Sequence, residues 1–464
     1  MTHNWSGLES FVYKCMTEHL IPGAAVAVWQ NGSTVYARGF GHRDRGTHEP
    51  VDADTVFGIA SITKSFTTMA VMQLVDRGLL SVDTPVTEYV PEFHPKAIRP
   101  GEVRISHLLS HTAGLPPLPS ISYTPSDNER LPPTLTTPEG LITADALGAY
   151  LRHINDDTYE VYGRPGEYFS YSNPCFVIAS AVIERIVGQP FYQYVRENIF
   201  RPIGMGRTTF LTSDLAGMSN VTRLYSNNKK GETLPVLEWP DARVFGASGG
   251  IKSTANDLVK YAAVYANGGA RGHIRVLSET SVRRMYTPVH KLTRSAHYGF
   301  AVQVTPDYWG YTLVEHGGSL TGVSSTFGFV PEASLAAVTL TNVQNAPAAD
   351  IWLAAINTAL GMPIEQKRIV EPFWVAPPRH LEKYVGAYKS AEGADIRINS
   401  GNNGITIRMG DDEFPLRATG EEYASYDYYG QERLVRFFLK PDGGVLGMFH
   451  GTSMSGIRLV RKVE

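Results

Sequence analysis

Three short motifs carry residue types that together can form an acyl-transfer site. The motifs are an S-x-x-K at Ser61 and Lys64, a Y-x-N at Tyr171 and Asn173, and an H-x-G that begins at His316. A serine hydroxyl is a weak nucleophile until a neighbouring base removes its proton. Lys64 can be that base only if burial or nearby cations lower its pKa from about 10.4. The motifs therefore predict covalent catalysis at Ser61 with Lys64 as the base.

Spacing alone does not separate these motifs from chance matches. A second S-x-x-K begins at Ser226, and further copies of the other two patterns lie at 225–227, 265–267 and 297–299. The Asn-, Lys- and Gly-rich stretch 225–231 predicts an exposed turn, and 265–267 predicts the end of a helix. For Ser61 the structural alternative is a helix-capping serine beside a surface lysine. The sequence around Ser61 favours the catalytic interpretation.

A helix over residues 61–77 must position the first motif. Its apolar residues recur at three- and four-residue steps, and Gly78 provides the stop signal. Residues three apart share one helix face, so Lys64 is expected beside Ser61. The helix N-terminus supplies backbone N–H groups and a partial positive charge. Both would favour an oxygen that becomes anionic during the reaction.

Strand patterns occur at both ends of the first 360 residues, and helices lie between them. Asn31–Gly32 is a strong hairpin signal. The predicted strands are 24–29, 34–40, 311–315, 327–330 and 335–340, and further helices are predicted at 6–20, 175–187, 257–265 and 348–360. We expect an α/β (α+β) fold, in which one antiparallel sheet is assembled from both chain ends, is flanked by helices, and carries an inserted helical lobe.

The last hundred residues read as a separate unit. A Pro-rich stretch precedes short strand patterns at 395–399, 405–409, 433–439 and 456–461, which predict a small all-β sandwich or barrel. The expected domains are 1–365, with the helical lobe at about 65–245, a linker at 366–378, and a β domain at 379–464. The stretch 116–138 contains seven of the 29 prolines. A functional lid and a disordered loop are equally good interpretations of it.

The flanking sequences resemble the serine β-lactamase and penicillin-binding protein superfamily. The segments that carry the resemblance are 21–28, 57–67, 107–115, 165–173 and 249–254, together with the three motifs in order. Within that superfamily they are most similar to the class C-like branch, which includes D-aminopeptidases, esterases and transesterases. The stretch 380–388 resembles the start of the lipocalin-like barrel domain appended to many relatives. The resemblance therefore implies a β-lactamase-like fold with a C-terminal lipocalin-like barrel.

The resemblance also implies roles for the motif residues. Ser61 would be the acylated nucleophile and Lys64 its base, while Tyr171 would pass the proton to the leaving group. Asn173 would orient the lysine and the substrate amide. The oxyanion hole would be the backbone N–H groups of Ser61 and Ser319, with Gly318 beside them.

His316 stands where penicillin-recognising relatives have a lysine. A neutral imidazole is a poorer partner than an ammonium for the carboxylate of a β-lactam. This difference makes true β-lactamase activity less expected than peptidase or esterase activity. Tyr162, Tyr168 and the aromatic group at 308–311 either wall the pocket or pack in the core.

The resulting prediction is a serine hydrolase that cleaves an amide or ester of a small-molecule or peptide substrate without a cofactor. Two alternatives stay open: an acyltransferase or transesterase that uses a small-molecule acceptor, and a non-hydrolytic penicillin-binding sensor. The pair His107 and His111 has metal-ligand spacing, but no third ligand pattern accompanies it. We therefore expect capping or packing roles for both histidines, and no metal.

Composition limits the other partners. With 42 basic and 45 acidic residues, the net charge is −3, which provides no field for holding nucleic acid. Two cysteines rule out a disulfide scaffold and predict free thiols. No segment is apolar for the roughly 20 residues that a membrane span needs, and residues 1–5 lack a signal-peptide pattern. We expect a cytoplasmic protein without membrane contacts, which can form a homo-oligomer.

Overall fold

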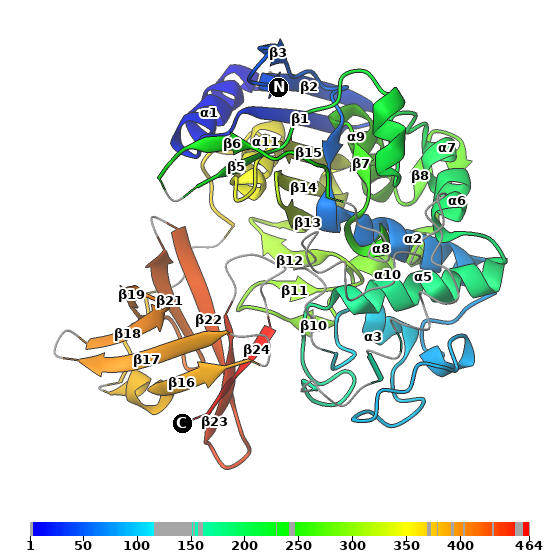
Figure 1. The fold of residues 1–464 in the computed structure, drawn as a ribbon. Helices are drawn as coiled ribbons and strands as arrows, with labels where there is room; N and C mark the ends of the chain where they lie inside the picture. The colour runs from blue at the N-terminus through cyan, green and yellow to red at the C-terminus, as the bar shows by residue number, and fades with distance from the viewer. Residues whose placement is uncertain are drawn as a thin grey trace.

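The structure is a computed structural model, which describes residues 3–115, 151, 154–155, 161–228, 230–240, 246–368, 373–377, 379–390, 394–401, 404–428, 431–450 and 458–463. Its main element is a nine-stranded antiparallel sheet with the order β10-β11-β12-β13-β14-β15-β1-β2-β3 (Figure 1). These strands span His290–Lys291, His297–Tyr298, Gln303–Tyr308, Tyr311–Leu320, Val323–Val330, Leu335–Thr341, Gly23–Gln30, Ser33–Asp44 and Glu49–Pro50. Strand β1 pairs with both β15 and β2, so the N-terminal hairpin completes a sheet that the later strands begin.

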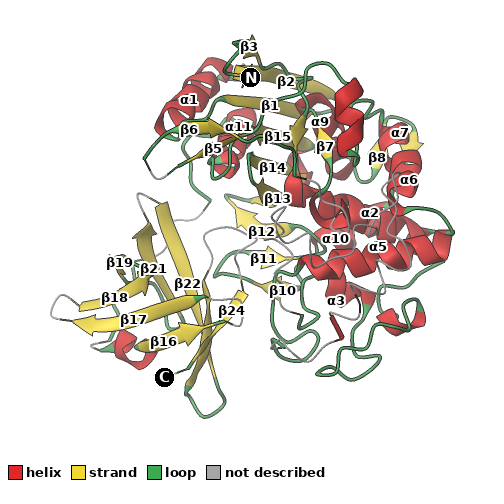
Figure 2. Ribbon diagram, in the orientation of Figure 1, coloured by secondary structure: helices red, strands yellow, loops and turns green. Residues whose placement is uncertain are grey.

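Helices cover both faces of this sheet (Figure 2). Alternate residues of β1 belong to two different cores: Ala25 and Ala27 face one, and Val26 and Val28 face the other. This alternation is the period of two that a strand imposes on its side chains. Helices α1 (Trp5–Glu18) and α11 (Ala348–Leu360) pack on the second face, and α9 (Ala255–Ala266) packs on the first. The central strands β1, β14 and β15 are therefore buried on both sides.

The remaining helices form a helical region beside one face of the sheet, with α2 at its centre. Its helices are α2 (Thr63–Asp76), α3 (Ile105–Leu109), α5 (Asn173–Val187), α6 (Phe191–Val195), α7 (Arg201–Ile203), α8 (Gly246–Gly249) and α10 (Glu279–Tyr286). The short helical turns are η1 (Ala60–Ile62), η2 (Val86–Glu88), η5 (Arg196–Phe200), η6 (Thr212–Gly217), η8 (Pro331–Ala333) and η9 (His380–Tyr384). The minor strands are β4 (Phe57–Gly58), β5 (Tyr225–Asn227), β6 (Thr233–Pro235), β7 (Lys252–Ser253), β8 (Ala270–Arg271) and β9 (Ile274–Arg275). Helix α2 is buried along almost its whole length, which makes it the central helix of the larger core.

The C-terminal strands form a second nine-stranded antiparallel sheet that curves into a nearly closed barrel (Figure 1). The strands are β16 (Gly386–Lys389), β17 (Asp395–Gly401), β18 (Gly404–Met409), β19 (Asp412–Pro415), β20 (Arg417–Ala418), β21 (Tyr423–Tyr428), β22 (Gln431–Leu439), β23 (Val445–His450) and β24 (Arg458–Lys462). Its own apolar core includes Tyr384, Ile398 and Phe437. The predicted fold class is confirmed, and the open choice between sandwich and barrel is decided in favour of a barrel. The exact domain boundaries stay a prediction.

Two sequence-based predictions of local structure need correction. Residue 61 does not open an α-helix: Ser61 lies in the 3₁₀ turn η1, and α2 begins at Thr63. The stretch 225–231 is not simply an exposed turn, because Tyr225 is buried in strand β5, which pairs with β6. The Pro-rich stretch 116–138 lies outside the described residues. Within the described residues no single helix could cross a membrane, although the bent pair α5 and α6–α7 has the combined length and composition.

Candidate active site

Ser61 lies on a strained turn between the sheet and α2. The residue before it, Ala60, has a φ of 45°, a left-handed conformation that costs energy for a residue with a Cβ. The surrounding structure holds this turn in place. The Ile59 N–H donates to the Ile251 carbonyl at 3.0 Å, and Ser325 Oγ donates to the Ile59 carbonyl at 2.9 Å. Strain maintained by surrounding bonds is common at functional sites.

A glycine in β13 lets the sheet approach this turn. A Cβ added at Gly318 would overlap the Ile59 carbonyl oxygen and Ser325 Oγ, so any larger residue would force the turn and β13 apart. Ser319, the next residue of β13, pairs with Ser324 of β14 and is partly exposed. The close approach therefore places Gly318 against the backbone of the Ser61 turn. This is the region in which the oxyanion hole was predicted.

Lys64 is fully buried and contacts the Ser61 hydroxyl. Its Nζ lies 3.1 Å from Ser61 Oγ and donates a second hydrogen bond, of 2.8 Å, to the Ser248 carbonyl in α8. The Nζ also lies 4.8 Å from the ring centroid of Tyr171 and 5.6 Å from that of Phe176. Because burial strips water from the ammonium, the pKa of Lys64 is lowered well below its usual value. The structure thus meets the condition that the sequence set for a lysine base.

Tyr171 is also buried beside this pair. Its hydroxyl has no hydrogen bond of standard geometry to any described residue. Burial raises the pKa of Tyr171 above its usual value, and the nearby Ser61 hydroxyl opposes part of that rise. Tyr171 is therefore a neutral phenol close to Ser61. Asn173, two residues on, is the first residue of α5 and is partly exposed. The second acceptor of the Lys64 ammonium is the Ser248 carbonyl, and the role expected of Asn173 stays a prediction.

His316 is fully buried, and both of its ring nitrogens are engaged. Nδ1 donates to the Gly317 carbonyl at 2.6 Å, which leaves Nε2 to accept from the Tyr298 hydroxyl at 2.9 Å. Burial, together with the nearby Lys64, lowers the pKa of His316 to about 3. The imidazole is therefore neutral and presents no free N–H group. His316 therefore packs inside the protein behind the site and is not exposed to a substrate.

Strands of the barrel pack against the same aromatic group. Phe449 of β23 and Leu459 of β24 belong to one buried cluster with Phe169, Tyr171 and Tyr298. Polar contacts join the two parts as well. Arg436 of β22 donates to the Lys291 carbonyl at 2.6 Å, and Arg461 of β24 donates to the Val161 carbonyl at 3.1 Å. The barrel thus contributes apolar side chains to the buried cluster that contains Tyr171.

The comparisons with known proteins agree with this geometry. The sequence model of the beta-lactamase family matches residues 8–360. This chain belongs to the beta-lactamase family. Penicillin-binding protein 4 of Amycolatopsis lactamdurans is 27% identical over 396 residues, which cover 82% of this chain and 96% of that protein. Esterase EstB of Burkholderia gladioli is 33% identical over 210 residues, which cover 45% of this chain and 52% of the esterase.

A solved structure extends the likeness across both parts of this beta-lactamase-family protein. The octameric penicillin-binding protein homologue from Pyrococcus abyssi is 26% identical and superposes with a TM-score of 0.70. The match covers 99% of this chain and all of that one, so it includes the C-terminal barrel. The predicted resemblance is therefore confirmed. Members of this family are serine hydrolases.

Sequence reasoning missed several residues of the site in this beta-lactamase-family protein. Tyr298 belongs to the second H-x-G match, at 297–299, yet it is the residue that bonds to His316. Ser248 carries no motif, because its carbonyl rather than its side chain acts; the only signal was its place just before the family-like segment 249–254. His111 was interpreted as structural, but its ring lies 4.1 Å from that of Tyr171.

Other predicted features have local roles. The His107 ring accepts from the Arg104 N–H at the start of α3, and the described residues include no group of three or more metal-ligating side chains. In the aromatic group at 308–311, Tyr308 packs in the core against α11, and Trp309 is 62% exposed at the surface. Tyr162 lies in the cluster around Tyr171. Both cysteines are free and buried.

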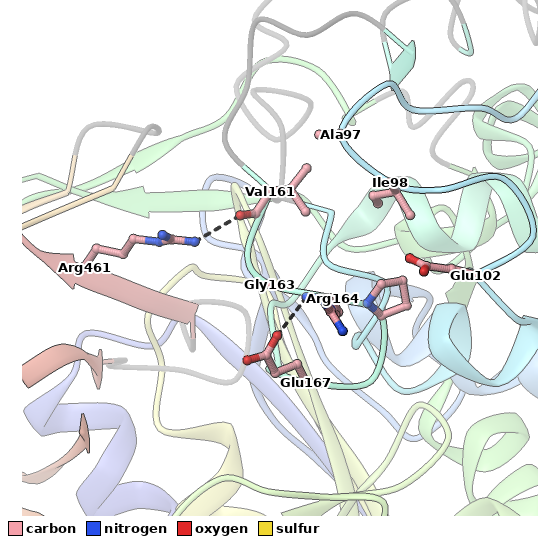
Figure 3. Close-up of a pocket in the computed structure, with 9 residues that line it drawn as sticks. Ala97, Ile98, Glu102, Val161, Gly163, Arg164, Glu167 and Arg461 are labelled. Atoms are coloured by element: carbon pink, nitrogen blue, oxygen red, sulfur yellow. Dashed lines mark hydrogen bonds between the residues drawn. The ribbon is translucent and has the colours of Figure 1, made fainter. Parts of the chain in front are cut away.

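A pocket of about 290 Å³ lies at segment 161–167, and Ser61 is not among its lining residues (Figure 3). It is lined by Ala97, Ile98, Glu102, Val161, Gly163, Arg164, Pro165, Glu167 and Arg461. The Arg164 N–H donates to the Glu167 carboxylate at 3.0 Å, and Arg461 reaches in from β24. The pocket therefore marks the junction of segment 161–167 with the barrel, and its lining is more polar than the cluster around Tyr171.

Proposed function

We propose that this protein is a serine hydrolase that cleaves an amide or ester of a small-molecule or peptide substrate through an acyl-enzyme at Ser61. The observation that carries the proposal is the pairing of a partly exposed Ser61 with a fully buried Lys64 at 3.1 Å. A lysine that burial holds neutral can accept the serine proton. The backbone N–H groups of Ser61 and Ser319 would then stabilise the tetrahedral oxyanion. Tyr171 would pass the proton to the leaving group.

The environment of His316 supports an ester or amide over a β-lactam as the substrate. Recognition of a β-lactam carboxylate benefits from a fixed positive charge. Here the imidazole is neutral, fully buried, and bonded at both nitrogens. It therefore offers a bound carboxylate neither charge nor a free donor. The esterase among the relatives fits this preference.

Substitution of the two central residues tests the proposal. We expect Ser61→Ala and Lys64→Met to lower kcat/KM for p-nitrophenyl butyrate or a D-alanine p-nitroanilide by at least about 10³-fold. Ser226→Ala is the matched control, because Ser226 opens the second S-x-x-K of the same chain and should leave turnover unchanged. Undiminished turnover by Ser61→Ala would refute the assignment. Nitrocefin, assayed in parallel, ranks the β-lactam against the other substrates.

The pH dependence tests the role of the lysine. Only the neutral amine can accept a proton, so kcat/KM should rise with pH through a pKa well below the ordinary value of Lys64. Lys64→Arg stays protonated at every accessible pH and should remove this rising limb together with most of the activity. A wild-type profile that rises only near the ordinary lysine pKa would contradict a neutral base.

Intact-mass spectrometry during turnover separates hydrolysis from the two alternatives. A hydrolase shows a transient adduct of one acyl group, whereas a penicillin-binding sensor keeps its adduct after the substrate is removed. An acyltransferase gives a transfer product when a small alcohol or amine is added. The proposal expects the protein to return to its unmodified mass and to release free acid. A lasting adduct on every substrate would overturn the hydrolase assignment.

We also propose that the protein assembles as a homo-oligomer. The support is the P. abyssi homologue, which is octameric and matches this chain over its whole length. Size-exclusion chromatography with light scattering measures the mass directly. A single species of 51.0 kDa at micromolar concentration would contradict the proposal.

A further inference from the structure

His111 forms hydrogen bonds with the residues on both sides of Tyr171. Its carbonyl accepts the N–H of Ser170 at 2.8 Å, and its Nδ1 accepts the N–H of Ser172 at 3.0 Å. These two donors are the residues immediately before and after Tyr171. His111 thus fixes the backbone N–H groups of both residues that flank the proposed proton-transfer tyrosine.

The conformation of His111 makes this double contact possible. His111 has a φ of 56°, in the left-handed region that few residues other than glycine adopt. It lies two residues after the end of α3, and the chain that follows it forms hydrogen bonds with the segment that leads to Tyr171. The N–H groups of Tyr162 and Gly166 donate to the carbonyls of Gly114 and Thr112. The turn is therefore part of a built contact between the two segments.

The ring of His111 lies within the site and is not exposed. Its centroid lies 4.1 Å from that of Tyr171, 5.2 Å from Phe176 and 5.4 Å from Tyr298. Because Nδ1 accepts a hydrogen bond, the proton of the neutral ring is on Nε2, and this nitrogen is buried without a partner among the described residues.

We infer that His111 is a positioning residue, which holds the Tyr171 hydroxyl at Ser61 by anchoring the backbone N–H groups of the two residues that flank the tyrosine. The inference rests on the proposed function, because it assigns Tyr171 the proton transfer. The ring stays neutral during this task, since burial and the neighbouring Lys64 hold the pKa of His111 well below its usual value. A charged ring would oppose protonation of that lysine during acylation.

Three variants separate positioning from general stability. His111→Phe keeps a ring but loses the Nδ1 acceptor. His111→Asn keeps an acceptor on the same side-chain position and tolerates a positive φ. Ser170→Ala is the matched control: it removes a buried hydrogen bond, of 3.1 Å to the Leu115 carbonyl, between the same two segments. We expect kcat to fall by about 10²-fold in His111→Phe with KM within about threefold, and by less than about tenfold in the other two.

A double-mutant cycle with Tyr171→Phe decides whether His111 acts through the tyrosine. If it does, His111→Phe should cost less than about threefold in kcat once the hydroxyl is absent. An equal loss in both backgrounds would overturn the inference. Should His111→Phe fail to fold, a loss of more than about 10²-fold in His111→Asn would overturn it as well. A wild-type-like Tyr171→Phe, or an active Ser61→Ala, would instead refute the proposed function, so the two failures are distinguishable.

Discussion

Gly318→Ala is the perturbation that most directly tests how the sheet shapes the site. The added methyl would stand roughly 1 Å inside ordinary van der Waals contact with the Ile59 carbonyl oxygen. That oxygen cannot turn aside, because it belongs to the backbone and accepts a hydrogen bond from Ser325. Either β13 or the Ser61 turn must therefore move by about the overlap, roughly 1 Å.

A shift of this size has two measurable consequences. Overpacking a closely packed core costs about 1–3 kcal/mol of stability. A displacement of about 1 Å between the proposed nucleophile and the proposed oxyanion donors costs about 10²-fold in rate, or about 2.7 kcal/mol of transition-state stabilisation. We therefore expect Gly318→Ala to remain folded, to keep KM, and to lose about two orders of magnitude in kcat.

The neighbouring glycine provides the control. A Cβ at Gly317 would meet the Ser325 carbonyl oxygen at 3.6 Å, which is an ordinary contact, so Gly317→Ala should change kcat by less than about threefold. Steady-state hydrolysis of p-nitrophenyl butyrate gives kcat and KM, and urea unfolding gives the stability of each variant. If Gly318→Ala matched Gly317→Ala in kcat, the close approach of β13 would have no catalytic role and the reasoning would be wrong.

Three further predictions concern the groups that support the site. Tyr298→Phe leaves the buried Nε2 of His316 without its donor and should lower the free energy of unfolding by about 1–3 kcal/mol in urea titrations. An unchanged unfolding midpoint would show that this hydrogen bond does not stabilise the fold. Burial lowers the pKa of His290 from 6.5 to about 4, so the unfolded state binds more protons between these values. Stability should therefore fall by as much as about 3 kcal/mol as the pH drops through this window, and His290→Gln should lose less over the same range. Arg368→Met leaves the buried Glu315 carboxylate unpaired and should lower the free energy of unfolding by about 3–5 kcal/mol. The double variant with Glu315→Leu should recover part of that loss. If it recovered none, the ion pair between the two residues would not be the source of the stability.

Local pattern predicted much of the fold. Helix α11 spans the predicted residues 348–360, and the Asn31–Gly32 signal marks the hairpin of β1 and β2. These features depend on neighbours a few residues apart, which the sequence displays directly. The start of α2 was displaced by two residues because Ser61 lies in a turn that distant segments hold. Strand β5 was not predicted, because a run of polar residues shows neither its partner strand nor the burial of Tyr225.

The candidate site divides in the same way. The spacing of Ser61 and Lys64 predicted their contact, since residues three apart share a face in a 3₁₀ turn as well as in an α-helix. The second partner of the lysine, the Ser248 carbonyl, lies 184 residues away and carries no side-chain signal. Tyr298 was visible only as a chance match to the H-x-G pattern, because a hydrogen bond across two strands leaves no trace in either strand alone.

The sequence by itself thus determined which groups can react, in which order they occur, and the family to which the chain belongs. Only the tertiary structure decided their state. Burial lowers the pKa of Lys64, and the absence of a Cβ at Gly318 admits the Ser61 turn. His316 is buried, with both of its ring nitrogens in hydrogen bonds. The physical reason is that desolvation and close packing are set by residues from many parts of the chain, which only the folded molecule brings together.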